Sequence, residues 1–116
     1  MKDHKDLDVW IQSMLLVEDI YALTKNFPSD EKYGLSSQIK RAVVSIPSNI
    51  AEGAGRKGDK EFIQFLYIAM GSLSELETQL ILSNRLQFVN SIEISLHQIA
   101  KIKKTLFGLI SYVNNK

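Results

Sequence analysis

Apolar residues recur at every third or fourth position along most of the chain, a spacing that predicts amphipathic α-helices. The predicted helices span about residues 7–26, 35–53, 59–83 and 91–113. Four helices of about 20 residues joined by short connections predict an all-α fold, a left-handed up-down-up-down four-helix bundle. Residues 7–113 then form one domain, with a flexible polar tail over residues 1–6 and frayed residues 114–116.

Capping residues mark the predicted helix boundaries. Asp6 or Asp8 is the expected N-cap of the first helix, and Asp59 that of the third, because short acidic side chains accept hydrogen bonds from free backbone N–H groups. Asn90, followed three residues later by Glu93, predicts a capping box for the fourth helix.

Proline and glycine shape the second helix. Pro47 lies inside its apolar stripe, which resumes in phase at Ile50, so we expect a continuous helix with a bend. The glycines of segment 53–58 predict a left-handed cap at its end.

The first helix carries more apolar surface than one neighbour requires. We assign its core stripe to Leu7, Trp10, Met14, Val17 and Tyr21. A second stripe lies beside it, and part of the third helix is also apolar outside its main stripe. These positions are the candidate oligomer interface: Leu16, Ile20, Leu23, Ile63, Tyr67 and Met70. They predict self-association, although the same residues could instead complete the core of a monomer.

Composition narrows the class of protein. The chain has 116 residues, 45% hydrophobic residues, no cysteine and a net charge of +1, which fits one globular domain and excludes disulfides and thiolate chemistry. No apolar run is long enough to span a membrane. The polar start of the chain lacks the apolar core of a secretory signal, so we expect a cytoplasmic protein without membrane contact.

Charge alternates along the chain. Residues 1–33 carry a net charge of −3, residues 34–60 carry +3, residues 61–90 carry −2 and residues 91–116 carry +3. Acidic and basic segments could therefore attract one another, or the two basic segments could form one basic face if they lie together.

Catalytic patterns are missing from the sequence. The two histidines, His4 and His97, do not form the Glu-x-x-His pairs of a di-metal bundle site. No Gly-x-Ser-x-Gly motif occurs, and segment 53–58 lacks the ending of a phosphate-binding loop. We therefore expect no enzyme activity, no metal, no cofactor and no small-molecule substrate.

Polar residues interrupt the apolar faces of the second and third helices. The expected structural polar cluster comprises Arg41, Asn49, Glu52, Glu75 and Glu77. Our hypothesis is that Arg41 pairs with Glu75 or Glu77 and that Asn49 bonds backbone freed by Pro47, because buried polar groups need partners.

Basic residues supply candidate contacts for nucleic acid, since phosphates are recognised by positive charge without regard to sequence. The candidates are Lys40, Arg56, Lys57, Lys60, Lys101, Lys103 and Lys104. A homo-oligomer would repeat each small patch and strengthen binding.

Several segments of the chain resemble a known family. They are Leu7–Trp10, Tyr33–Ala42, Val44–Gly53, Lys60–Phe62 and Gly71–Leu80. These segments resemble the bacterial four-helix-bundle family encoded in intervening sequences of 23S ribosomal RNA genes. The string Ile-Pro-Ser-Asn-Ile-Ala-Glu-Gly, from Ile46 to Gly53, is its most specific part. The chain departs from the family at Ala54, where an aromatic residue is common, and at Gln87, where a helix-ending glycine is common.

The resemblance carries functional expectations. The family is similar to the accessory protein of diversity-generating retroelements, a pentameric bundle that binds a reverse transcriptase and nucleic acid. The resemblance therefore implies a non-catalytic homopentamer. We expect a binding or scaffold protein for RNA, DNA or a ribonucleoprotein partner. The alternative is a protein–protein adaptor that binds no nucleic acid and uses the apolar surface of the first helix.

Overall fold

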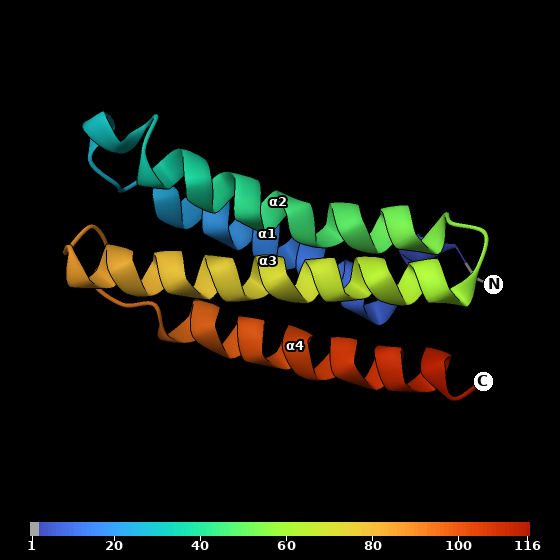
Figure 1. Ribbon diagram of the computed structural model, residues 1–116. Coiled ribbons are helices and arrows are strands. Elements are labelled where there is room, and N and C mark those ends of the chain that lie inside the picture. Colours follow the sequence, from blue (N-terminus) through green and yellow to red (C-terminus); the bar gives the residue numbers. More distant parts are fainter. Residues whose placement is uncertain (1–2) are drawn as a thin grey trace.

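The computed structural model describes residues 3–116, which contain four long helices and two short 3-10 turns and no strand. The elements are η1 (His4–Asp6), α1 (Asp8–Thr24), η2 (Ser29–Glu31), α2 (Leu35–Ala54), α3 (Asp59–Arg85) and α4 (Glu93–Asn114). Successive helices run in opposite directions (Figure 1). The predicted all-α four-helix bundle is confirmed.

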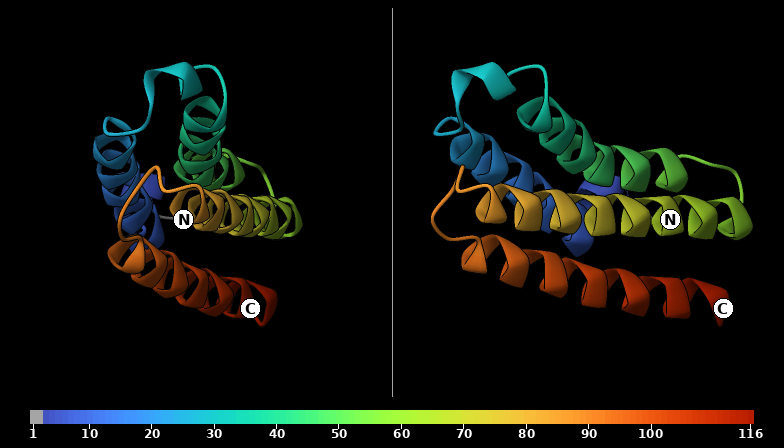
Figure 2. Two further views of the ribbon diagram at one scale, coloured as in Figure 1. Left: turned by 90° about the vertical axis from the view of Figure 1, so that its left-hand side faces the viewer. Right: turned by 60° about the vertical axis from the view of Figure 1, so that its left-hand side comes forward.

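The helices are arranged in chain order around the bundle axis. Helix α1 packs against α2 and α4, and α3 packs against the same two helices, whereas α1 does not contact α3. In the view along the bundle, α1 lies opposite α3 and α2 opposite α4 (Figure 2). The two basic segments, 34–60 and 91–116, therefore lie mainly on opposite helices and do not form one face.

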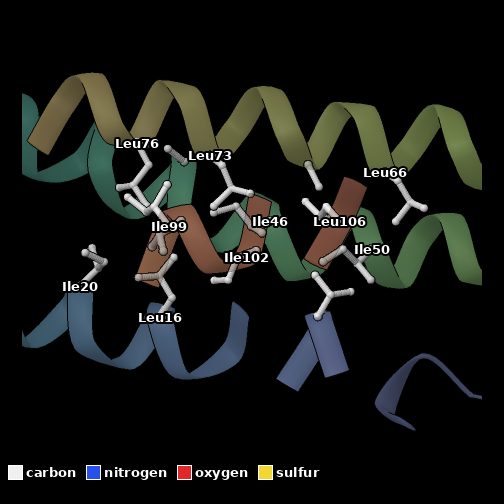
Figure 3. Close-up of a cluster of buried hydrophobic side chains, with 14 of the residues drawn as sticks. Leu16, Ile20, Ile46, Ile50, Leu66, Leu73, Leu76, Ile99, Ile102 and Leu106 are labelled. Carbon is white, nitrogen blue, oxygen red and sulfur yellow. The ribbon is translucent and has the colours of Figure 1, made fainter. Parts of the chain in front are cut away.

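The core is built from leucine and isoleucine side chains of all four helices (Figure 3). The apolar stripe of α3 is buried throughout and comprises Phe62, Leu66, Ala69, Leu73, Leu76 and Leu80. The apolar stripes of α2, from Leu35 to Ile50, and of α4, from Ile92 to Val113, are buried or half-buried. The innermost side chains are at most 1% exposed and include Leu16, Ile20, Ile46, Ile50, Leu66, Leu73, Leu76, Ile99, Ile102 and Leu106. Burial of each such side chain contributes roughly 1.5–3 kcal/mol to folding.

The core face of α1 differs from the prediction. The buried positions are Val9, Ser13, Leu16, Ile20 and Thr24, whereas two residues of the predicted stripe, Met14 and Tyr21, are exposed. Two polar residues, Ser13 and Thr24, interrupt the apolar pattern of this face in the sequence. Their hydroxyls donate to carbonyls of their own helix, Ser13 to Val9 at 2.7 Å and Thr24 to Tyr21 at 3.0 Å, which removes the cost of burying them.

Helix α2 stays continuous through the buried Pro47, and its ribbon changes direction near the middle (Figure 1). It approaches α3 closely at Gly53, where an added Cβ would lie 2.6 Å from Phe65 Cβ. Glycine is needed here because two helix backbones approach too closely for a side chain between them.

The predicted caps were wrong in detail. The N-cap of α1 is Leu7 and that of α3 is Gly58, so Asp8 and Asp59 are instead the first helical residues. There the carboxylates still favour the positive end of the helix dipole. The N-cap of α4 is Ile92, and neither Asn90 nor its partner forms the predicted capping box.

Left-handed backbone occurs at the end of α3 and not at the predicted glycines. Within residues 3–116 no glycine has positive φ, and the one other residue that does is Gln87, at 66°. The N–H of Phe88 donates to the carbonyl of Ser83 at 2.9 Å, and the N–H of Gln87 donates to Asn84 at 3.1 Å. This pair of bonds is the Schellman motif, which usually contains glycine at the position of Gln87.

The two ends of the chain lie at the same end of the bundle (Figure 1). Part of the predicted tail, residues 4–6, forms η1 and contacts α1 and α2, and the rings of His4 and Trp10 meet edge to face at 5.2 Å. Residues 1–2 of the predicted tail lie outside the described residues. No helix within residues 3–116 combines the length and the apolar character needed to cross a membrane.

Candidate nucleic-acid interface

The predicted phosphate contacts lie in three separate places. Arg56, Lys57 and Lys60 gather at the α2–α3 turn, three lysines follow one another on α4, and Lys40 lies alone in the first half of α2. Opposite ends of the bundle carry Lys40 and the α2–α3 turn, because α2 runs the length of the molecule between them (Figure 1). The structure therefore does not bring these cations together within one chain.

The α2–α3 turn forms an open pocket with both chain ends. Its lining includes Asp3, Arg56, Lys57, Asp59 and Lys116. Acidic groups neutralise part of its positive charge, because Lys116 lies 3.9 Å from Asp59. The N–H of Lys5 donates to Asp3 at 3.1 Å, and this bond holds the pKa of the Asp3 carboxyl below its ordinary value.

Arg56 is held in place, whereas its neighbours are free. Its guanidinium donates to Glu52 at 2.9 Å and lies 5.0 Å from the centre of the Phe65 ring. Lys57 and Lys60 are exposed and form no ion pair within residues 3–116. These two lysines are the side chains of the turn that are available to an incoming phosphate.

The three lysines of α4 divide in the same way. Lys103 forms a 2.9 Å ion pair with Glu77 that ties α4 to α3. Lys101 and Lys104 are exposed, and neither forms an ion pair with any residue of the described chain. Two of the α4 candidates therefore remain available for phosphate, and the third has a structural partner.

The polar cluster is only partly assembled. The predicted pair between Arg41 and Glu75 or Glu77 is wrong, because Glu77 binds Lys103. Arg41 and Glu75 line one groove between α2 and α3 without forming an ion pair. Both are exposed, so water solvates their charges and no buried partner is required.

The prediction for Asn49 was also wrong. Its amide donates to the carbonyl of Ser45 at 2.7 Å. The carbonyl that Pro47 leaves without a helical partner belongs to Val43, four residues earlier. Asn49 therefore reinforces the turn before the proline without replacing the missing bond, and Glu52 binds Arg56.

The apolar interface candidates need correction on α1. Leu16 and Ile20 are completely buried within the single chain, so they are unavailable to a partner. Leu23, Ile63 and Met70 pack partly against the core. Tyr67 is 53% exposed and remains available on α3.

The exposed apolar side chains of α1 are on its other side. Ile11 is 45% exposed and Leu15 is 54% exposed, and their i, i+4 spacing places them on one outer face. Sequence reasoning missed this face, because Ile11 and Leu15 belong to neither of the two predicted stripes of the first helix.

Sequence reasoning missed a pocket at the start of α2. It includes Tyr21, Lys32, Tyr33, Lys40 and Arg41, contributed by α1, the following connection and α2. The only local signal in the sequence was the neighbouring pair Lys32 and Tyr33 in the loop before α2. The other lining residues lie within residues 32–45, except Tyr21 of α1, which joins them when α1 and α2 pack.

Within residues 3–116, no group of three His, Cys, Asp or Glu side chains is placed to hold a metal ion. His97 is exposed on α4, apart from the core.

Comparison with known proteins identifies a family and several solved structures that resemble the chain. The sequence profile of the family described as 23S rRNA-intervening sequence protein matches residues 5–108. A crystal structure of a protein with unknown function from the S23 ribosomal protein family of Bacteroides thetaiotaomicron superposes with a TM-score of 0.78 at 27% sequence identity. The match covers 88% of this chain and 97% of that chain. No curated protein matches the chain.

Proposed function

The chain belongs to the 23S rRNA-intervening sequence protein family, and we propose that it is a non-catalytic, homo-oligomeric binding or scaffold protein for RNA, DNA or a ribonucleoprotein, working in the cytoplasm. The observation that carries the proposal is apolar surface exposed on opposite faces of the bundle, on α1 and on α3, with further exposed side chains on α4 such as Ile94 and Phe107. Ile11 and Leu15 on α1, and Tyr67 on α3, are between 45% and 54% exposed. Side chains of this size on two helix faces favour a partner.

The positions of these faces favour a ring. A symmetric dimer would cover one patch against its own copy, whereas two different patches on opposite sides join head to tail. Helices α1 and α3 are one of the two opposite pairs in this bundle. A head-to-tail contact that closes gives a ring, and five copies is the size that the family resemblance implies.

The free lysines support the nucleic-acid part of the proposal. Lys57, Lys60, Lys101 and Lys104 are exposed and without ion pairs in the described part of the chain. One chain with a net charge of +1 binds phosphate weakly. A ring repeats each pair of lysines in every copy, and simultaneous contacts raise the overall affinity.

The proposal is tested by fluorescence anisotropy with labelled single-stranded RNA at increasing salt. We expect the affinity to fall steeply with salt, because bound lysines release counterions from the phosphates. The double variant Lys57→Gln, Lys60→Gln should bind more weakly and reduce the slope of log affinity against log salt by about 0.7 for each lost phosphate contact.

The matched control is Arg85→Gln, which removes an exposed charge that also lacks an ion pair among residues 3–116 but lies at the far end of α3. It should leave the salt slope unchanged. Absence of RNA binding even at about 50 mM salt would reject the nucleic-acid part. The exposed face of Ile11 and Leu15 would then favour the protein–protein adaptor.

A further inference from the structure

The missed pocket at the start of α2 combines aromatic rings with positive charge. We propose that it is a site for single-stranded RNA in which a base stacks on Tyr33 while Lys32, Lys40 and Arg41 hold the adjoining phosphates. This inference rests on the proposed function and names the part of the surface that reads single strands.

Tyr33 is placed for contact with a partner and not for folding. It is 89% exposed, in the short connection between η2 and α2. An aromatic ring left in water gains nothing from the core, so Tyr33 has no structural partner that explains its position. Its ring, with Lys32 beside it, lines an open pocket, and exposed rings of this kind are surfaces on which unpaired bases stack.

A second aromatic ring adds a further stacking surface to the site. Tyr21 reaches the same pocket from α1, and Lys40 Nζ lies 5.2 Å from the centre of its ring. In the same lining, Lys32 Nζ lies 5.6 Å from the centre of the Tyr33 ring. Each ring therefore carries a cation beside it, and a bound nucleotide would meet a stacking surface and a phosphate contact together.

The charge of the pocket favours an anion. Three cations line it, and its described lining contains no carboxylate. The nearby Glu31 is not part of the lining, and its carboxylate accepts a 3.0 Å hydrogen bond from the N–H of Leu35 at the start of α2. A lining that contains cations and no carboxylate favours a phosphate backbone.

The volume of the pocket and its aromatic rings favour single-stranded RNA over a duplex. The pocket has a volume of about 560 Å³, within the range of roughly 300–1,000 Å³ typical of ligand sites. A duplex keeps its bases stacked inside the helix, so it could use the cations but not the rings.

The test measures the affinity of the full chain for a labelled 12-nucleotide RNA, single-stranded and as a blunt duplex, by fluorescence anisotropy. Tyr33→Ala should weaken single-strand binding by about 5- to 100-fold, the usual range for loss of one stacked base, and leave duplex binding unchanged. Tyr33→Phe should bind like the parent chain, because the ring and not the hydroxyl stacks.

Tyr112→Ala is the matched control. Tyr112 is also largely exposed, and Lys116 Nζ lies 5.7 Å from the centre of its ring, but it lies at the other end of the bundle. It should leave both affinities unchanged. Equal losses for Tyr33→Ala and Tyr112→Ala, or equal losses of single-strand and duplex binding, would overturn the site.

The failures of the two proposals can be told apart. If the parent chain and the Tyr33→Ala variant bind single-stranded RNA with equal affinity, this site is overturned and the proposed function stands. A parent chain that binds neither RNA would overturn both. Displacement of the RNA by a polyglutamate peptide, with equal potency for the parent and for Tyr33→Ala, would assign the pocket to acidic protein segments instead.

Discussion

Gly53 sets how closely α2 and α3 approach. We predict that Gly53→Ala destabilises the chain, because the new Cβ would lie 2.6 Å from Phe65 Cβ and 3.3 Å from the carbonyl oxygen of Phe62. Overpacking of this kind costs about 1–3 kcal/mol, more than the roughly 0.5–1 kcal/mol that alanine gains over glycine in a helix. Urea denaturation measures the difference.

Gly71→Ala is the control for that substitution. Gly71 lies inside α3 and nothing surrounds the place of its Cβ, so alanine should stabilise the chain by about 0.5–1 kcal/mol. If both variants shift the unfolding midpoint in the same direction, the close approach at Gly53 does not limit packing.

Single residues also show where sequence reasoning failed. Ser13 and Thr24 are polar residues at core positions of α1, and each satisfies its hydroxyl within its own helix. A pattern of apolar residues alone does not reveal such bonds, so the wrong face of α1 was assigned to the core. The predicted ion pair of Arg41 was also wrong, because its expected partner Glu77 pairs with Lys103 across the α3–α4 contact.

At the scale of elements, the end of α3 is the least favourable local structure. We predict that Gln87→Gly raises the stability by about 1 kcal/mol, because a Cβ in left-handed backbone costs about 1–2 kcal/mol and glycine gives back part of this in unfolded-chain entropy. For a chain of this size the melting temperature should rise by roughly 3–8 °C, measured by circular dichroism.

Gln87→Ala separates backbone strain from loss of the glutamine side chain. Alanine keeps the Cβ at φ 66°, so it should not stabilise the chain. A rise in melting temperature equal to that of the glycine variant would show that the side chain, not the left-handed backbone, was unfavourable.

The sequence predicted the existence and type of all four helices, together with the core faces of α2, α3 and α4. Each of these helices has one apolar stripe that continues over several turns, and the extra apolar residues of α3, Ile63, Tyr67 and Met70, form only a short second one. Helix ends were less predictable. Asp8 and Asp59 lie one residue inside the observed ends, because Ncap position depends on backbone angles that several neighbouring residues can adopt.

At the scale of the whole molecule, neighbouring helices carry opposite charge. The segments that contain α1 and α3 are net acidic and those that contain α2 and α4 are net basic, and each helix packs only against helices of the other kind. Attraction therefore acts across every contact of the bundle, and the same arrangement prevents a single basic face.

The α2–α3 turn was predictable because its cations are close in sequence. The tyrosine pocket was not, because it requires α1 and α2 to be packed.

The apolar faces give a prediction about assembly. Replacing both Ile11 and Leu15 by serine should lower the molar mass in solution, because these exposed side chains would no longer be covered by the next copy. The fold should persist, since surface substitutions change stability by about 0.5 kcal/mol or less each. Sedimentation velocity measures the loss of assembly, and circular dichroism checks the fold.

Leu86→Ser provides the comparison, because Leu86 is 56% exposed but lies beyond the end of α3, outside both faces. It should leave the assembly intact. Loss of assembly in this variant alone would place the contact at the end of the bundle and not along α1.

The most direct test of the account is the molar mass of the parent chain in solution, measured by light scattering over a wide range of concentration. The account predicts a closed assembly whose mass is a fixed multiple of 13.1 kDa, with about 66 kDa expected for a ring of five. A mass that stays at 13.1 kDa at the highest concentration reached would contradict it, because the apolar faces of α1 and α3 would then need no partner.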